Sequence, residues 1–198
     1  MEHSDLETRD RIVASALSLF ARRGYAATSI QDIVSAADVT KPALYYYFES
    51  KAALFQAIVD RAYEERFQLM QDAVAKTGDI RSQLIEIVGG RFEYLQKNRD
   101  LMRVAYATAF AAEEELPKDT RRMEKSGRNF EFIHGLIVEA QKRGELAKNY
   151  DSHELAFAVH GQMNIYIMND LLYPECRLCR PTAERIVDLF LKGAASSK

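Results

Sequence analysis

The 198-residue chain is poor in cysteine, with two residues, Cys176 and Cys179, in the segment ECRLCRP. Two cysteines cannot build a disulfide framework, and their CxxC spacing supplies half of a zinc site whose second ligand pair is missing. No βαβ pattern surrounds the motif, which argues against a thioredoxin-like centre. We therefore expect reduced thiols in a loop, with a redox switch as the alternative, and neither a metal site nor a cofactor.

Long hydrophobic runs and an excess of positive charge are also absent. No apolar stretch approaches the roughly 20 residues of a membrane span. The polar start MEHSDLETRD lacks the hydrophobic region of a signal peptide, so we expect a cytoplasmic protein with no membrane partner. The net charge is −2, and residues 1–60 carry six Lys and Arg against eight Asp and Glu. Any nucleic-acid binding must therefore depend on the placement of individual charges.

Strand patterns are nearly absent as well. No alternating run of β-branched residues is bounded by turn signals, and the chain holds nine glycines and four prolines. Apolar residues recur instead at helical spacing along the whole chain. This pattern predicts an all-α fold of about nine helices. The expected ranges are about 5–23, 29–36, 41–47, 50–76, 79–97, 100–113, 118–143, 151–171 and 182–195.

The second and third predicted helices have clear start signals. Thr28 is expected to cap the second helix, with Gln31 as its capping-box partner, and Thr40 is expected to cap the third. Leu44 and Phe48, spaced i and i+4 in the third helix, form its expected buried pair. Two short helices joined by a tight turn, the second capped and exposed, make a helix-turn-helix. In that motif the second helix enters the major groove of DNA.

The segment TKPALYYYF places three consecutive tyrosines, Tyr45, Tyr46 and Tyr47, on this third helix. Consecutive helical residues are rotated by roughly 100°, so the three rings cannot all face one core. An exposed tyrosine offers its hydroxyl to phosphate and its ring to sugar or a thymine methyl group. Lys41 and Lys51 add positive charge at the starts of the third and fourth helices. An ordinary half-buried surface helix is the alternative, but the coincidence of caps, lysines and tyrosines favours DNA binding.

The segment ATSIQDIVSAADVTKPALYYYFESKAALF, preceded by Gly24-Tyr25, resembles the DNA-binding domain of the tetracycline-repressor (TetR) family of bacterial regulators. The resemblance covers roughly Arg9 to Val59 without a gap. The matching features are the glycine-aromatic pair, the spacing from Thr28 to Ile33, the K-x-x-L-Y-x-x-F core and the S-K pair. Beyond Val59 only the length, the helical character and the C-terminal IVDLFLKGA are similar.

The resemblance implies roles for individual residues. Phosphate contacts would come from Thr28, Thr40, Tyr45, Tyr46 and Lys51, and base-edge contacts from Lys41, Pro42 and Tyr46, with Tyr47 beside them. Asp38 stands where the family usually has glycine, and aspartate tolerates a left-handed backbone better than most residues. Pro42 stands where a small residue is common, so its base contact would be apolar and the operator preference would differ from that of relatives.

We expect residues 1–50 to form the helix-turn-helix DNA-binding domain, joined by the long fourth helix to a helical effector-binding and dimerisation domain within residues 51–198. The resemblance implies a small-molecule pocket in that bundle. Candidate lining residues are large side chains, many with a polar tip: Phe92, Tyr94, Met102, Tyr106, Phe110, Phe132, His134, Met163, Asn164, Tyr166 and Met168. Aromatic and methionine side chains at this spacing are also typical of an ordinary core. His160 and Asn164, at i and i+4, are expected to be a buried, satisfied pair.

The last two helices predict a homodimer. The segments ELAFAVHGQMNIYIMNDLL and AERIVDLFLKGA are apolar on more than one face, so they must be buried on several sides. Two-fold pairing would place two reading helices about one DNA turn apart, ~34–36 Å, which predicts a palindromic DNA operator. The predicted function is therefore a ligand-responsive transcriptional regulator, a repressor that a small-molecule effector releases from its operator.

Two other classes are weighed against this prediction. An enzyme is not expected, because the sequence has no P-loop, GxSxG, HExxH or dinucleotide-binding glycine pattern. The second alternative is a helix-turn-helix regulator controlled by a protein partner, or by oxidation of Cys176 and Cys179, in place of a small ligand.

Overall fold

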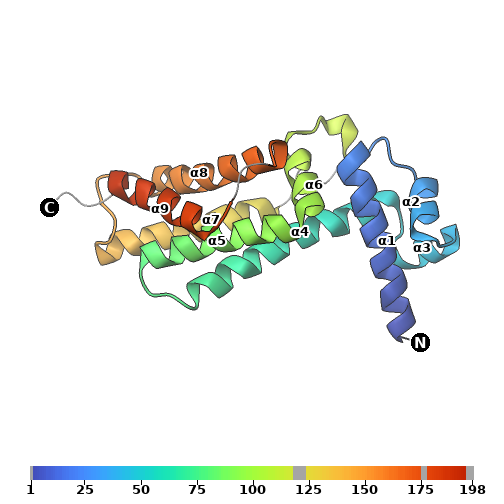
Figure 1. Ribbon diagram of the computed structural model, residues 1–198, viewed down its shortest axis with the longest axis horizontal. Coiled ribbons are helices and arrows are strands. Elements are labelled where there is room, and N and C mark those ends of the chain that lie inside the picture. Colours follow the sequence, from blue (N-terminus) through green and yellow to red (C-terminus); the bar gives the residue numbers. More distant parts are fainter. Residues whose placement is uncertain (1, 118–123, 175–177, 195–198) are drawn as a thin grey trace. The chain divides into compact units, whose positions relative to one another are not determined.

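The computed structural model describes residues 2–117, 124–174 and 178–194, which form nine α-helices, one short 3-10 helix and no strand (Figure 1). The predicted all-α fold is confirmed. Backbone contacts divide the chain into two compact units. The N-terminal unit comprises the described residues within Met1–Ala62 and Asp100–Met123, and the bundle unit those within Tyr63–Arg99 and Glu124–Lys198. This division differs from the predicted boundary at residue 50, because the fourth helix contributes to both units.

The N-terminal unit is built around three helices that contact one another, α1 (Glu2–Arg23), α2 (Ile30–Ala37) and α3 (Lys41–Tyr47). It also contains the first half of α4 (Lys51–Val74), most of α6 (Arg99–Phe110) and the 3-10 helix η1 (Glu113–Glu115). Its core side chains include Ile12, Ala16, Phe20, Ile33, Val34, Leu44, Leu54, Phe55 and Ile58. These are the apolar positions at helical spacing in the sequence, so the periodicity that predicts the helices also supplies the core.

The start of α2 differs from the prediction. Ser29, and not Thr28, is the N-cap: its Oγ accepts from the Asp32 backbone N–H at 3.1 Å, and the Asp32 carboxylate accepts from the Ser29 backbone N–H at 2.9 Å. The Ser29 hydroxyl, which donates to the Asp32 carboxylate at 2.6 Å, and then the Ser29 backbone N–H hold the pKa of Asp32 below its usual value. Thr28 is buried, and its hydroxyl donates to the Gly24 carbonyl at 2.8 Å. The predicted Thr28–Gln31 capping box is therefore wrong by one residue.

The bundle unit combines the second half of α4 with α5 (Ile80–Lys97), α7 (Glu124–Arg143), α8 (Ser152–Leu172) and α9 (Arg180–Ala194) (Figure 1). Helix α5 packs against α7, α8 and α9, and α8 packs against α7 and α9. The predicted seventh helix starts at residue 118, but residues 118–123 lie outside the described part and α7 begins at Glu124. Core residues include Leu84, Ile87, Phe92, Ile137, Val159, Met163, Ile167 and Val187.

An ion pair is built into the interior of the bundle unit. The Asp170 side chain on α8 is 1% exposed, and its carboxylate accepts from the Arg99 guanidinium at 2.7 Å. The same guanidinium also donates to the Asp170 backbone carbonyl. A buried carboxylate is costly to desolvate unless a counter-charge and further hydrogen bonds compensate it. Arg99 supplies both, so the buried Asp170 side chain is compensated within the unit.

His160 and Asn164 form the hydrogen-bonded pair that their spacing predicts, but both side chains are half-buried and not fully buried. The Asn164 amide donates to His160 Nδ1 at 3.0 Å, and the Asn164 oxygen accepts from Arg91 at 3.4 Å. Burial, and then the positive charges of Arg91 and Arg66, lower the pKa of His160 to about 4. The imidazole is therefore neutral at pH 7 in the folded chain, as its role as an acceptor requires.

This depressed pKa predicts a loss of stability in acid. The unfolded chain binds a proton at His160 near the ordinary pKa of 6.5, whereas the folded chain does so near 4. Stability contributed by neutral His160 is thus complete above pH 6.5 and falls as the pH drops from 6.5 to 4, by ~3 kcal/mol in all. We expect His160→Gln to lack this part of the pH dependence in urea unfolding followed by circular dichroism. His153→Gln, at an exposed histidine of the same helix, is the control. Identical pH profiles for wild type and His160→Gln would contradict the assignment.

Candidate functional site

The surface of α3 carries the three consecutive tyrosines. Tyr45 is 49% exposed and Tyr46 is 76% exposed, while Tyr47 is half-buried and its ring meets that of Tyr46 edge-on at 4.9 Å. Within the described residues, neither the Tyr45 nor the Tyr46 hydroxyl has a hydrogen-bond partner. Lys41 and Pro42 are also exposed at the start of the helix. The predicted exposure of at least one phenol is confirmed, and two of the three face solvent.

The opposite face of α3 anchors it. Leu44 is fully buried and Phe48 is 6% exposed, which confirms the predicted buried pair. The Thr40 hydroxyl accepts from the Ala43 backbone N–H at 3.3 Å and so caps the helix as predicted. Asp38 adopts the left-handed backbone that the turn requires, with φ 51°. Because α2 and α3 are fixed in this way by packing, caps and turn, the exposed tyrosines stand on a rigid helix-turn-helix.

Lys51 is placed differently from the prediction that it contacts phosphate. Its Nζ donates to the backbone carbonyls of Tyr25 at 2.9 Å and of Thr28 at 2.8 Å, and it lies 4.1 Å from the centre of the Tyr25 ring. Burial lowers the pKa of Lys51. The ammonium thus ties the loop between α1 and α2 to the first turn of α4. Thr28, buried with its hydroxyl engaged, is likewise turned away from solvent.

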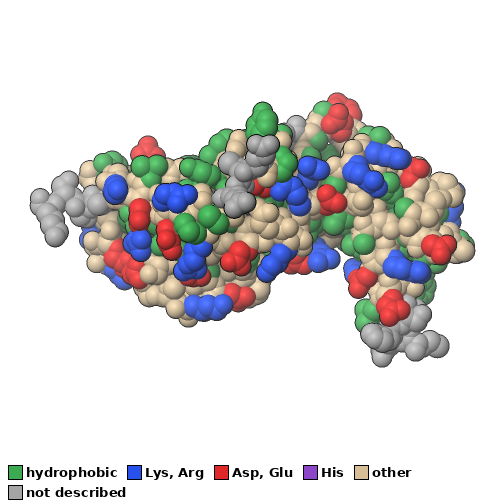
Figure 2. All heavy atoms as spheres, in the orientation of Figure 1, with side chains coloured by type: hydrophobic (Ala, Val, Ile, Leu, Met, Phe, Trp, Pro, Cys, Tyr) green, Lys and Arg blue, Asp and Glu red, His purple; other side chains and the backbone are tan. Residues whose placement is uncertain are grey.

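The face of the molecule drawn in Figure 2 has no broad patch of positive charge. On the face seen in Figure 2, Lys and Arg side chains are interspersed with Asp and Glu. This agrees with the net charge of −2 for the chain. Contacts with a polyanion must then come from a few positions such as Lys41, as the sequence predicts.

The structure does not gather the predicted effector residues into one site. Phe92, Met102 and Met163 are core residues, each at most 1% exposed. Met102, Tyr106 and Phe110 belong to the N-terminal unit, and the others to the bundle unit. The side chain of Phe110 lies outside the described part. Phe132, His134, Asn164 and Met168 are half-buried, and Tyr166 is 39% exposed. The most buried of these large side chains are therefore part of an ordinary core, which is the alternative interpretation of their helical spacing.

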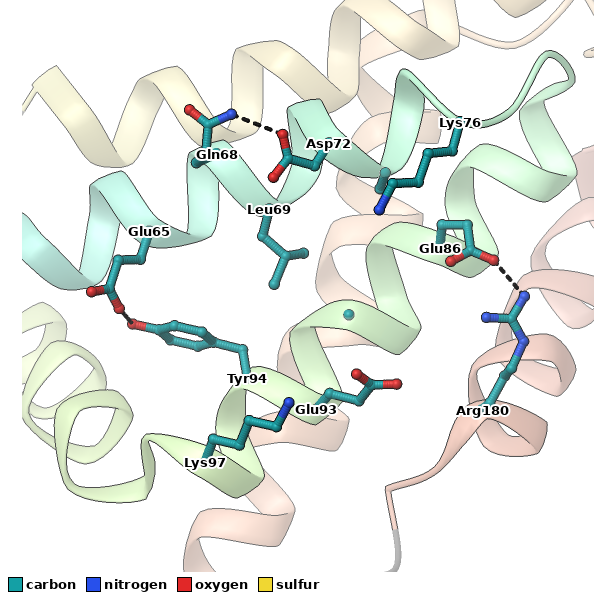
Figure 3. Close-up of a pocket in the computed structure, with 12 residues that line it drawn as sticks. Glu65, Gln68, Leu69, Asp72, Lys76, Glu86, Glu93, Tyr94, Lys97 and Arg180 are labelled. Carbon is teal, nitrogen blue, oxygen red and sulfur yellow. Dashed lines mark hydrogen bonds and ion pairs between the residues drawn. The ribbon is translucent and has the colours of Figure 1, made fainter.

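Tyr94, which is also among the predicted effector residues, does line a cavity. A cavity of about 520 Å³ lies between the second half of α4, α5 and α9 in the bundle unit (Figure 3). The Tyr94 hydroxyl donates to Glu65 at 2.6 Å, and Arg180 pairs with Glu86 at the side of the cavity. Its other lining residues are mostly charged or polar: Gln68, Asp72, Lys76, Glu93 and Lys97, with Leu69, Ala73 and Gly90 as the apolar members. Charged side chains from α4, α5 and α9 therefore surround this cavity.

Helix α8 presents an apolar face to solvent. Phe157 is 63% exposed, Ile165 53% and Leu172 66%, and Gly161 lies between the first two on the same side. Leu189 on α9 is 64% exposed. Single exposed apolar residues are ordinary, but a stripe along one helix is typical of a surface that binds protein. No helix in the described part is both long and apolar enough to cross a membrane.

Comparison with known proteins agrees with this architecture. Residues 12–58 match the model of the bacterial regulatory proteins of the tetR family. The chain is 31% identical to the probable HTH-type transcriptional regulator YttP of Bacillus subtilis, over 51% of this chain and half the length of YttP. It is 27% identical to the probable acrEF/envCD operon repressor of Escherichia coli K12, over 84% of this chain and 77% of that protein. The structure of FadR from Bacillus subtilis in complex with stearoyl-CoA shares the fold, with a TM-score of 0.80 at 15% identity over 92% of this chain and 97% of that one.

A helix-turn-helix with an exposed second helix, followed by a separate helical bundle, defines a DNA-binding regulator of transcription. The matched segment covers α2, α3 and the parts of α1 and α4 that hold them. Over residues 12–58 the chain is similar to the bacterial regulatory proteins of the tetR family.

Proposed function

We propose that the chain is a homodimeric repressor that reads a palindromic operator with α3 and is released by a small molecule. The observation that carries the proposal is the exposed, capped surface of α3, where two phenolic hydroxyls and one lysine have no partner among the described residues. Unpaired donors grouped on one rigid face suit the phosphates and base edges of a duplex.

The roles follow from position on the helix. Thr40 and Lys41 lie at the helix start, where free backbone N–H groups also favour phosphate. Tyr46 is the most exposed of the three tyrosines and is assigned to base edges, together with Pro42. Tyr45 contacts phosphate on the flank. Tyr47, half-buried against Tyr46, holds that ring in place. Thr28 and Lys51 are left out, because their polar groups are occupied within the unit.

Selection of bound DNA from a random pool, followed by fluorescence anisotropy on the selected operator, tests this interface. Tyr46→Ala should weaken operator binding by ~1–3 kcal/mol and relax the sequence preference, as loss of a base contact does. Lys41→Ala should weaken binding and reduce its salt dependence if the lysine contacts phosphate. Tyr150→Ala and Lys148→Ala, at exposed positions of the bundle unit, are the controls. Unchanged affinity and sequence preference in both α3 variants would refute the assigned roles.

The apolar stripe on α8 supports the dimer. Phe157, Ile165, Leu172 and, on α9, Leu189 are large apolar side chains that packing within the chain leaves exposed. A second copy of the chain, related by two-fold symmetry, covers them with the same stripe. Gly161 in the middle of the stripe permits close approach of the two α8 helices.

A buried cation supports the small ligand. Arg91 is 3% exposed; among the described residues it makes one hydrogen bond, at 3.4 Å to Asn164, and its Nε has no partner. An arginine buried without a counter-charge is costly. A ligand with an anionic group would supply that charge inside the bundle unit. The fold neighbour FadR was solved with an acyl-CoA, which is also an anion.

The operator complex provides the assay for the effector. Anionic small molecules that release the operator from wild type would support the proposal, since a ligand shifts DNA binding only by its different affinity for the two states. The alternative is control by a protein partner or by cysteine oxidation. Cys179 is exposed, and Cys176 lies outside the described residues. A Cys176→Ser, Cys179→Ser variant that keeps its response to an effector would exclude the redox version.

A further inference from the structure

Two histidines and a glutamate from two different helices lie together on the surface of the bundle unit. Glu131 and His134 are one turn apart on α7, and His153 is at the start of α8. One ligand atom from each lies within 4.8 Å of the others. The His134 and His153 rings are only 3.7 Å apart between their centres. We propose that these three side chains bind a divalent transition metal, with Zn²⁺ as the best match.

The half-buried His134 is held in the orientation that a ligand needs. Its Nε2 lies 2.9 Å from the Ser152 hydroxyl, and its Nδ1 lies 3.5 Å from the Glu131 carboxylate. When Nε2–H donates to Ser152, the Nδ1 lone pair is directed toward Glu131. Metal-binding histidines are typically fixed in this way by a hydrogen bond from the second ring nitrogen. Ser152 thus acts as a positioning residue for His134.

The backbone of His153 is fixed as well. Asp151 caps α8, and its carboxylate accepts from the backbone N–H groups of His153 at 2.8 Å and of Glu154 at 3.1 Å. The His153 and Glu131 side chains are themselves more than half exposed. Because the backbone is fixed and the side chains are exposed, Glu131 and His153 can rotate to coordinate an ion that arrives from solvent.

The ligand set and the spacing fit zinc. Two imidazole nitrogens and one carboxylate oxygen are a common zinc set, and they leave a fourth position for water or another ligand. With metal–ligand distances near 2.0–2.2 Å, tetrahedral ligand atoms lie about 3.4 Å apart. The present separation of up to 4.8 Å must therefore shrink by ~1.4 Å, which rotation of the exposed Glu131 and His153 side chains allows. The bound ion would link α7 directly to the start of α8.

Titration of the full chain with Zn²⁺ after removal of metal by a chelator tests the site, with isothermal calorimetry for affinity and thermal unfolding for stability. One Zn²⁺ is expected per chain, with a higher melting temperature on binding, because the ion binds only the folded arrangement. His153→Ala and Glu131→Gln should each weaken Zn²⁺ binding at least ten-fold. Both residues are exposed, so neither variant should unfold the chain.

Two controls isolate the site. Glu139→Gln changes another exposed glutamate of α7, and His3→Ala removes a histidine from the N-terminal segment; both should bind Zn²⁺ as wild type does. Wild-type affinity in His153→Ala and in Glu131→Gln would overturn the proposal, as would loss of binding in His3→Ala alone. Because the titration uses no DNA, its outcome is separate from that of the operator experiments.

Discussion

Arg99→Met should lower the free energy of unfolding of the bundle unit by about 3–5 kcal/mol. The substitution removes the guanidinium that pairs with Asp170, whose side chain is 1% exposed, and leaves the buried carboxyl group without its partner. Methionine keeps much of the aliphatic stem of arginine, so lost packing contributes little. Urea unfolding of the full chain at fixed protein concentration, followed by circular dichroism, measures the loss.

Arg81→Met is the matched control. Arg81 also pairs with an aspartate across the bundle unit, at 2.8 Å from Asp188, but both side chains are well exposed to solvent. Water screens such a pair, so this variant should unfold close to wild type. The double variant Arg99→Met, Asp170→Leu should recover most of the stability, because it removes the unpaired carboxyl group. An Arg99→Met loss no larger than that of Arg81→Met would show that the buried pair has no special weight.

Ile165→Asp should convert the proposed dimer to a monomer and weaken binding to the proposed palindromic operator by a factor on the order of 10²–10⁴. The new carboxylate lies in the middle of the apolar stripe on α8, where the two copies would have to bury it twice. A monomer holds one half-site and loses the effective concentration that the first half-site provides for the second. Analytical ultracentrifugation reports the oligomeric state, and fluorescence anisotropy reports operator affinity.

Tyr150→Asp provides the comparison for this variant. Tyr150 is also an exposed apolar residue of the bundle unit, but it lies in the loop before α8 and outside the stripe. It should remain dimeric and bind the operator normally. If Ile165→Asp stays dimeric with wild-type operator affinity, the stripe is not the dimer interface.

The helix-turn-helix could be predicted from the sequence because its signals are local. Caps, helical spacing and the alternation of buried and exposed positions on α3 depend on neighbours in the chain. The predicted N-cap of α2 was wrong by one residue because two neighbouring pairs of residues both fit the capping-box spacing. Thr28–Gln31 and Ser29–Asp32 have the same spacing, and the choice was made by tertiary packing, which buries Thr28.

The roles of residues whose partners are distant in the sequence could not be predicted from local sequence patterns. Lys51 matches a phosphate-binding position by its place in the motif, yet its ammonium is engaged by carbonyls 23 and 26 residues earlier. The cluster of Glu131, His134 and His153 spans two helices, so no spacing rule reveals it. The predicted effector residues share only size and polarity, which describe a core as well as a cavity, and Arg91 was missed because one arginine in a helix carries no pattern.

The bond from Lys51 to the loop before α2 has a mechanical consequence. Since the ammonium donates to the carbonyls of Tyr25 and Thr28 at once, the beginning of α4 and the segment leading into α2 are expected to move together. A displacement of the start of α4 would therefore move the backbone that leads into α2, the first helix of the helix-turn-helix. A displacement of α4 can thus reach α2 without any contact on α3.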